Sequence, residues 1–232
     1  MVGAYESFRR DGHPSVAGTS FPSCWRWILA GVVVVDVVLE ACDAVGFEGW
    51  PVGELPEDGF LVLSGRMSSV DVGTAMAVIC AYNGIACAGG LTEAGLERRL
   101  AESGAWVAPG GLRFRDADAG VGIAPGCCFG LENWRDWWDV VRGQVPWLGH
   151  DPTPRVTHVG SVVRLQQDEG ESPSIELSRD DLSGLLASAQ EDLSGFQRCV
   201  REWAAVTAPE VAERLVSVLD ESFVISGVET RS

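Results

Sequence analysis

The most regular apolar pattern of the chain lies near its C-terminus, where apolar residues recur alternately four and three positions apart. This spacing puts a continuous apolar stripe on one face of a helix over more than three turns. Ser178, followed three positions later by Asp181, supplies a capping-box start. A second helix is predicted from Thr207 to about Leu219, so the two helices form an antiparallel hairpin. We expect the stripe to pack into the core, and it consists of Leu182, Leu186, Ala189, Leu193, Phe196, Val200 and Trp203.

Short apolar runs elsewhere in the chain predict strands. A β-branched run from Trp27 to Val35 predicts a buried strand, followed by a short helix through Ala44. Two runs on either side of the turn at 116–120 predict a hairpin. The strands predicted in the rest of the chain are Phe60–Leu63, Gly111–Arg115, Val121–Ala124, Val156–Val159, Val162–Gln166 and Ile175–Leu177.

Three further helices are predicted in the first two thirds of the chain. They are Ser69–Tyr82 with Asn83-Gly84 as its stop, a helix that begins near Thr92 and carries Leu96 and Leu100, and Glu132–Arg142 between two glycines. Strands and helices therefore mix without a regular alternation. This favours an α+β fold of short mixed or antiparallel strands with packed helices and the C-terminal antiparallel hairpin. Residues 1–22 are predicted to be a flexible tail and 23–228 one α+β domain, with residue 125 as the point of any sub-division.

The strongly negative net charge limits the kinds of partner that this protein is expected to bind. The net charge is −16, the basic residues are all arginines, and seven acids stand between Arg26 and Arg66 without a base. Residues 166–192 hold eight more acids against Arg179 alone. Such a chain is not expected to bind nucleic acid, because a binder must present cations to the phosphates. The blocks are either a solvated surface or the footprint of a basic partner protein, with Asp151, Asp168, Glu169 and Glu171 as partner-binding candidates.

Cysteine usage and hydropathy indicate a cytoplasmic protein that does not enter a membrane. The seven cysteines are odd in number and show no spacing typical of a small disulfide framework, which favours a reducing compartment. The nine-residue run from Trp27 to Val35 is too short to span a bilayer, which takes about 20 apolar residues. Asp36 and Glu40 interrupt its continuation and also argue against a secretory signal.

One group of residues suggests thiol chemistry. Cys127 and Cys128 come just before the predicted helix at 132, and His158, or His150 with Asp151 beside it, follows as a candidate base. A cysteine before a helix and then a histidine on a strand resembles the order in papain-like amidases and peptidases, which implies a cysteine-dependent hydrolase or transferase. The other interpretation is that both cysteines are small buried residues at a tight turn. No metal site or cofactor is expected, because adjacent cysteines and widely spaced histidines are a poor chelating set.

The tryptophan content is unusual, with nine in the chain. On the helix predicted at 132–142, Trp134 and Trp138 share the face that we expect to enter the core. Trp137 and Trp147 are predicted to belong to a binding surface. The preferred interpretation is a non-catalytic acidic module that binds a basic protein, in the manner of an immunity protein that neutralises a toxin. The cysteine-dependent enzyme and a small-ligand module built around the tryptophans are the alternatives.

Overall fold

Two antiparallel sheets and the helices that cover them make up the described part of the chain. The computed structural model describes residues 32–41, 47–85, 93–102, 104–168 and 172–227. The strand order is β2-β1-β3-β4 in one sheet and β5-β6-β7 in the other, so the predicted α+β class is confirmed. The tail predicted at 1–22 and the start of the first predicted strand lie outside the described residues.

The four-stranded sheet is built on β1, which runs from Val33 to Glu40. It pairs with β2 (Phe60–Leu63) and β3 (Gly110–Asp116), and β3 makes the predicted hairpin with β4 (Val121–Ile123). The short helix predicted to follow Val35 is wrong over residues 36–40, which continue the strand. The β-branched residues of this segment favour a strand, and the charge of Asp36 is compensated from the neighbouring strand.

The compensation comes from two arginines of β3. Asp36 accepts hydrogen bonds from the side chains of Arg115, at 2.7 and 3.1 Å, and of Arg113, at 3.4 Å. Asp58, in the loop before β2, accepts a second bond from Arg113 at 2.7 Å. Arg113 lowers the pKa of the Asp58 carboxyl, and Asp36 raises the pKa of the Arg115 guanidinium. Part of the first acidic block is therefore neutralised within the sheet.

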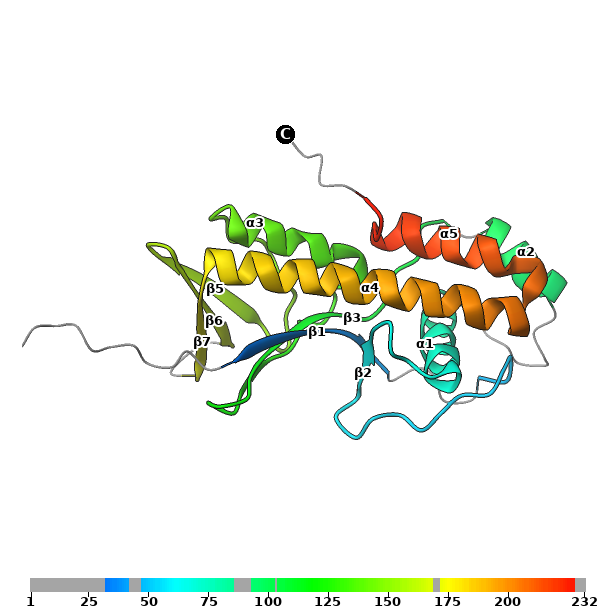
Figure 1. Ribbon diagram of the computed structural model, residues 1–232, viewed down its shortest axis with the longest axis horizontal. Helices are drawn as coiled ribbons and strands as arrows, with labels where there is room; N and C mark the ends of the chain where they lie inside the picture. The colour runs from blue at the N-terminus through cyan, green and yellow to red at the C-terminus, as the bar shows by residue number, and fades with distance from the viewer. Residues whose placement is uncertain (1–31, 42–46, 86–92, 103, 169–171, 228–232) are drawn as a thin grey trace, which may run out of the picture. The chain divides into compact units, whose positions relative to one another are not determined.

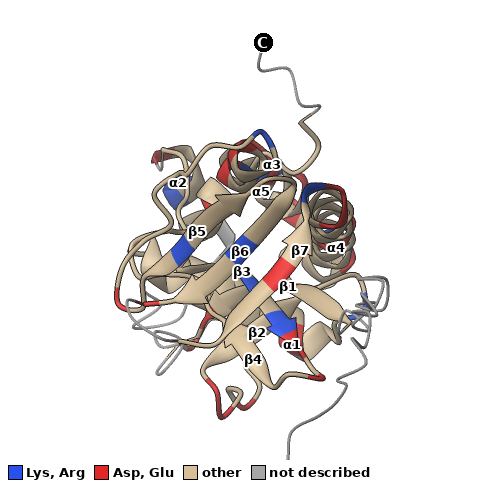
Figure 2. Cartoon of the chain, turned by 90° about the vertical axis from the view of Figure 1, so that its left-hand side faces the viewer, with Lys and Arg blue, Asp and Glu red and all other residues tan. Residues whose placement is uncertain are grey.

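The three-stranded sheet is formed by the predicted strands of the second half. They are β5 (Pro154–Val159), β6 (Val162–Gln167) and β7 (Ser174–Ser178). Alternate residues such as Val163 and Leu165 are buried, while Arg164 pairs with Glu176 across the outer face at 2.6 Å. Figure 2 shows this outer face with basic residues on β5 and β6 and an acidic residue on β7. The sheet surface therefore carries both signs of charge.

Four of the described helices follow the predicted pattern closely. α1 (Ser69–Tyr82) ends at Asn83 as predicted, and α2 (Glu93–Glu102) buries Leu96 and Leu100. α4 (Arg179–Thr207) begins with the predicted capping box of Ser178 and Asp181, in which each residue bonds the backbone of the other. The 3₁₀ turn η2 (Pro209–Val211) leads into α5 (Ala212–Phe223), which lies beside α4 as the second arm of the hairpin (Figure 1).

The apolar stripe of α4 is the centre of the core. All seven of its residues are buried, and the helix packs against β1, α1, α3 and α5. Figure 1 shows α4 lying between the four-stranded sheet on one side and α3 and α5 on the other. Packing against the body of the protein, rather than a coiled-coil partner, therefore accounts for the stripe.

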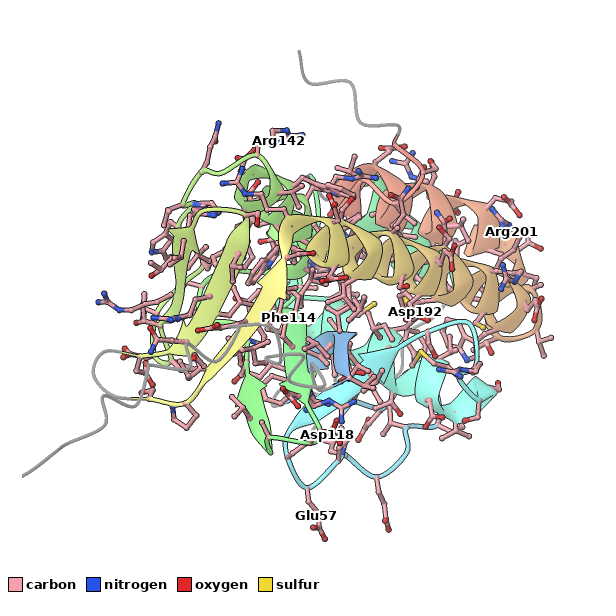
Figure 3. The ribbon with its side chains drawn as sticks, turned by 60° about the vertical axis from the view of Figure 1, so that its left-hand side comes forward. Glu57, Phe114, Asp118, Arg142, Asp192 and Arg201 are labelled. Atoms are coloured by element: carbon pink, nitrogen blue, oxygen red, sulfur yellow. The ribbon has the colours of Figure 1, made fainter. Side chains whose placement is uncertain are left out.

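The segment predicted as one helix at 132–142 differs from the prediction. It is a 3₁₀ helix, η1 (Leu131–Asp136), continued by the short α-helix α3 (Trp137–Val141). A 3₁₀ helix has about three residues per turn, so Trp134 and Trp137 lie on the same side. Trp137 is accordingly buried and packs on Phe114, with 4.6 Å between ring centroids. Figure 3 labels Phe114. The prediction that Trp137 belongs to a binding surface is wrong.

Candidate functional site

Two glycines bring the cysteine loop and the histidine loop together. A Cβ on Gly126 would lie 2.7 Å from backbone atoms of 148–150, and a Cβ on Gly149 would lie 2.7 Å from the Cys127 carbonyl oxygen. Because neither residue has a side chain, Cys127 N–H donates to the His150 carbonyl at 2.6 Å and His150 N–H to the Cys127 carbonyl at 3.2 Å. In such an antiparallel bridge the two side chains leave on the same face, with Cβ atoms about 5 Å apart.

The bridge between Cys127 and His150 brings one of the two candidate histidines next to the cysteines. His150 Nδ1 also lies 3.2 Å from Asp151 Oδ2, so Cys127, His150 and Asp151 are neighbours. His158 is held elsewhere, because its Nε2 lies 2.9 Å from the carbonyl oxygen of Gln144, in the loop after α3. Of the two predicted Cys–His pairings, the structure therefore brings together the one with His150.

The two cysteines are exposed, so the prediction of buried thiols is wrong. Cys128 adopts a left-handed backbone conformation with φ 62°, and this turn leaves both side chains at the surface. Their Sγ atoms are 3.5 Å apart. The hydrogen bond between the thiols raises the pKa of Cys127, and the charge of Glu40 acts in the same direction. Cys127 is therefore in its protonated form at neutral pH.

Beside the cysteines lies a cavity of about 400 Å³ whose wall carries two carboxylates. Glu40 comes from the end of β1, and Glu132 from the start of η1. Glu132 Oε2 accepts a hydrogen bond from the Ala108 N–H at 3.1 Å, and its carboxylate lies against Gly130, where a Cβ would collide with it. Among the residues that the structure describes, no arginine belongs to this wall, which also includes Tyr82, Val107, Cys127, Cys128 and Phe129.

An exposed aromatic side chain stands next to the cysteine loop. Trp147 is 59% exposed, and its ring centroid lies 6.2 Å from that of Phe129 and 6.4 Å from that of His150. The predicted surface position of Trp147 thus fits the structure. The side chain of Asp151 beside it is 93% exposed. Trp147, His150 and Asp151 therefore form one continuous surface with the cysteines.

Of the remaining acidic candidates, the structure describes Asp168, which has a structural role. Asp168 is exposed, but its carboxylate accepts from the Thr153 N–H at 2.7 Å and so fixes the end of the loop before β5. Glu169 and Glu171 lie outside the described residues. Sequence reasoning missed Glu132 and gave Glu40 no role in a site. No local signal identifies them, because the cavity is assembled from segments between residues 40 and 132 that are far apart in the sequence.

Within the described ranges, no three residues among His, Cys, Asp and Glu are placed to hold a metal ion, and no helix has the length and hydropathy needed to cross a bilayer. No family model matches the chain, and neither a curated protein nor a solved structure resembles it significantly. Function must therefore be argued from the site itself.

A labelling experiment tests the protonation of Cys127. Iodoacetamide reacts with the thiolate, so we expect Cys127 to label more slowly at pH 8 than an ordinary exposed cysteine. Cys128→Ala removes the thiol that raises the pKa of Cys127 and should accelerate labelling, whereas Cys199→Ala should not change it. The rates are read from peptide masses against pH. Fast labelling of wild-type Cys127 below pH 7 would contradict this account.

Proposed function

We propose that the protein is a non-catalytic, acidic binding module for a basic partner protein, and that the cavity receives a cationic side chain of that partner. The observation that carries the proposal is the pair of carboxylates, Glu40 and Glu132, in a cavity wall to which no described residue contributes a basic side chain. A neutraliser of a basic toxin or nuclease, comparable with an immunity protein, is the most concrete form of this function. Nucleic acid is not proposed as a ligand, because the net charge is −16.

The chemistry of the cavity favours arginine as the side chain that enters it. A guanidinium presents several N–H donors in a plane and can bond two carboxylates while its face lies on an aromatic ring. Tyr82 and Phe129 line the cavity, and Trp147 lies beside Phe129. Exposed tryptophan and tyrosine are also the residues most often found at the energetic centre of protein interfaces.

Several acids outside the cavity already form ion pairs within the protein, which makes the cavity the favoured place for the proposed contact. Asp36 and Asp58 are already paired with arginines of β3, and Glu176 is paired with Arg164. Asp181 closes the capping box of α4. These acids stabilise the fold, so the two acidic blocks are not uniform binding surfaces. Their summed charge still attracts a basic protein at long range and would accelerate association.

Titration with an arginine-rich peptide tests the proposal. We expect binding at low salt that weakens as salt rises, and no binding of the same peptide with citrulline in place of arginine. The double variant Glu40→Gln with Glu132→Gln should lose about tenfold in affinity for each carboxylate, since a hydrogen bond to a charged group contributes about 1.5–3 kcal/mol. Glutamine at 132 keeps an oxygen to accept from Ala108.

The matched control is Glu54→Gln with Glu57→Gln, which changes the net charge equally. Both residues are exposed in the loop before β2, where Figure 3 shows Glu57 directed into solvent. We expect this control to bind the peptide almost as well as the wild type. An equal loss in the two double variants would mean that general charge, and not the cavity, binds the peptide.

The cysteine-dependent hydrolase is the second candidate, and the bridge between Cys127 and His150 favours it. A nucleophilic cysteine with a base and an orienting carboxylate would be Cys127 with His150 and Asp151. The raised pKa of Cys127 speaks against it, because an activated cysteine has a lowered pKa. The labelling experiment above separates the two functions. We also propose a reducing, cytoplasmic setting, since the seven cysteines show no spacing of a disulfide framework.

A further inference from the structure

We propose that Cys127 and Cys128 are a redox-sensitive modification site, at which the two thiols close reversibly to a disulfide between adjacent residues. The two thiols belong to the same cavity wall as the carboxylates that we propose to bind a cation, but the proposal does not depend on that binding. It rests on the geometry of the cysteine loop alone.

The distance between the sulfurs favours closure within the pair. The two Sγ atoms are already 3.5 Å apart and in contact as donor and acceptor. A disulfide bond is about 2.05 Å long, so closure has to bring the two sulfurs about 1.5 Å closer together. Both members of the pair are exposed, whereas Cys80 is buried within α1 and Cys199 is half-buried on α4.

The covalent geometry of adjacent residues predicts that this disulfide is easily reduced. Consecutive Cα atoms are about 3.8 Å apart, whereas the Cα atoms of ordinary disulfides are usually 4.4–6.8 Å apart. A disulfide outside that range is strained, and strained or exposed disulfides are the labile and regulatory ones. We therefore expect a bond that forms under oxidising conditions and reopens in a reducing cytoplasm.

The surroundings of the pair allow both access and movement. Both cysteines are exposed, so a soluble oxidant can reach either sulfur. Cys127 is fixed by its two backbone hydrogen bonds to His150, whereas Cys128 occupies the left-handed turn that follows. Closure should therefore move the Cys128 side of the loop, which belongs to the cavity wall together with Glu132.

Glutathione disulfide is an oxidant that balances the reaction. The thiolate of one cysteine attacks a sulfur of glutathione disulfide, which forms a mixed disulfide and releases one glutathione thiolate. The second cysteine then attacks its neighbour's sulfur and releases the second glutathione. The two protons lost by the cysteines leave with the two glutathione molecules. The protein is oxidised by two electrons, and the oxidant is reduced by two electrons.

Mass spectrometry of one fragment tests the proposal on the full-length chain. Trypsin cuts after Arg115 and Arg135, and the fragment 116–135 contains Cys127 and Cys128 and no other cysteine. The protein is equilibrated with mixtures of reduced and oxidised glutathione, blocked with iodoacetamide and digested. We expect an unalkylated fragment, two hydrogen masses lighter than the free dithiol peptide, to replace the doubly carbamidomethylated fragment as the oxidised share rises. The doubly carbamidomethylated fragment should return when dithiothreitol is added before the blocking step.

Single variants distinguish this bond from other modifications. With Cys127→Ser or Cys128→Ser the fragment should instead carry one glutathione, whereas Cys199→Ser should behave as the wild type. A wild-type fragment that carries only glutathione adducts, or that is linked to another cysteine fragment, would overturn the proposal. The arginine-peptide titration is repeated on both redox forms. Since only that titration depends on the proposed function, a disulfide that forms without any peptide binding would refute the function and leave this inference standing.

Discussion

Replacing Trp134 with alanine is expected to destabilise the protein by about 3–5 kcal/mol, the range for removing a large aromatic side chain from a core. Trp134 is completely buried, and its indole N–H donates to the Phe223 carbonyl at 2.8 Å. The guanidinium of Arg135 lies over its ring, 4.6 Å from the centroid. The variant therefore loses apolar burial and leaves a buried carbonyl at the end of α5 without its donor. Urea denaturation followed by circular dichroism measures the change.

Trp147→Ala is the matched control for this substitution. Trp147 is 59% exposed, and changes at such surface positions usually alter the free energy of unfolding by no more than about 0.5 kcal/mol. The same variant should weaken binding of the arginine-rich peptide if Trp147 borders the proposed contact. A destabilisation by Trp147→Ala comparable with that of Trp134→Ala would show that the two tryptophans are assigned incorrectly.

The sequence predicts best those elements whose burial pattern is local. The stripe of α4 repeats with the helical period and starts at a capping box, so its face, its start and its partner helix can be predicted without knowledge of the rest of the fold. The same holds for α1 and for the hairpin of β3 and β4. In these elements the hydrophobic period and the turn residues indicate the same structure.

Two errors in the fold have long-range causes. Asp36 and Glu40, spaced by four residues in an apolar run, look like one face of a helix. Asp36 is instead compensated by arginines 77 and 79 residues away on β3, a pairing that no local pattern contains. A period of 3.6 residues predicts a surface position for Trp137, whereas the preceding segment is a 3₁₀ helix. The packing of Trp137 on Phe114 agrees with that shorter period.

The candidate site could be predicted only in part. Four of its residues can be selected from their side-chain chemistry alone, namely Cys127, His150, Asp151 and Trp147. They lie together in the structure. Their approach depends on the missing side chains of Gly126 and Gly149, which a single sequence does not distinguish from other loop glycines. The expectation of buried thiols followed the usual behaviour of free cysteine, and the left-handed turn at Cys128 overrides it.

The same substitution at two glycines of α4 is expected to change stability in opposite directions. Gly195 faces the turn after β2, where an added Cβ would lie 2.6 Å from the Gly65 Cα and 2.7 Å from the Gly65 nitrogen. Those neighbours are backbone atoms and cannot rotate away. Gly195→Ala must therefore push α4 away from the sheet, and overpacking of this kind destabilises proteins by about 1–3 kcal/mol.

Gly184→Ala, eleven positions earlier on the same helix, should stabilise the protein. Gly184 is exposed, and a Cβ placed there has no atom within 4 Å. Alanine at such a helical position is favoured over glycine by about 0.5–1 kcal/mol, because glycine loses more conformational freedom when the chain folds. Urea unfolding gives the change in the free energy of unfolding for each variant. The difference between the two changes cancels the general effect of Gly→Ala on helix propensity. If Gly195→Ala were as stabilising as Gly184→Ala, α4 would not approach the turn at Gly65 as closely as the structure has it.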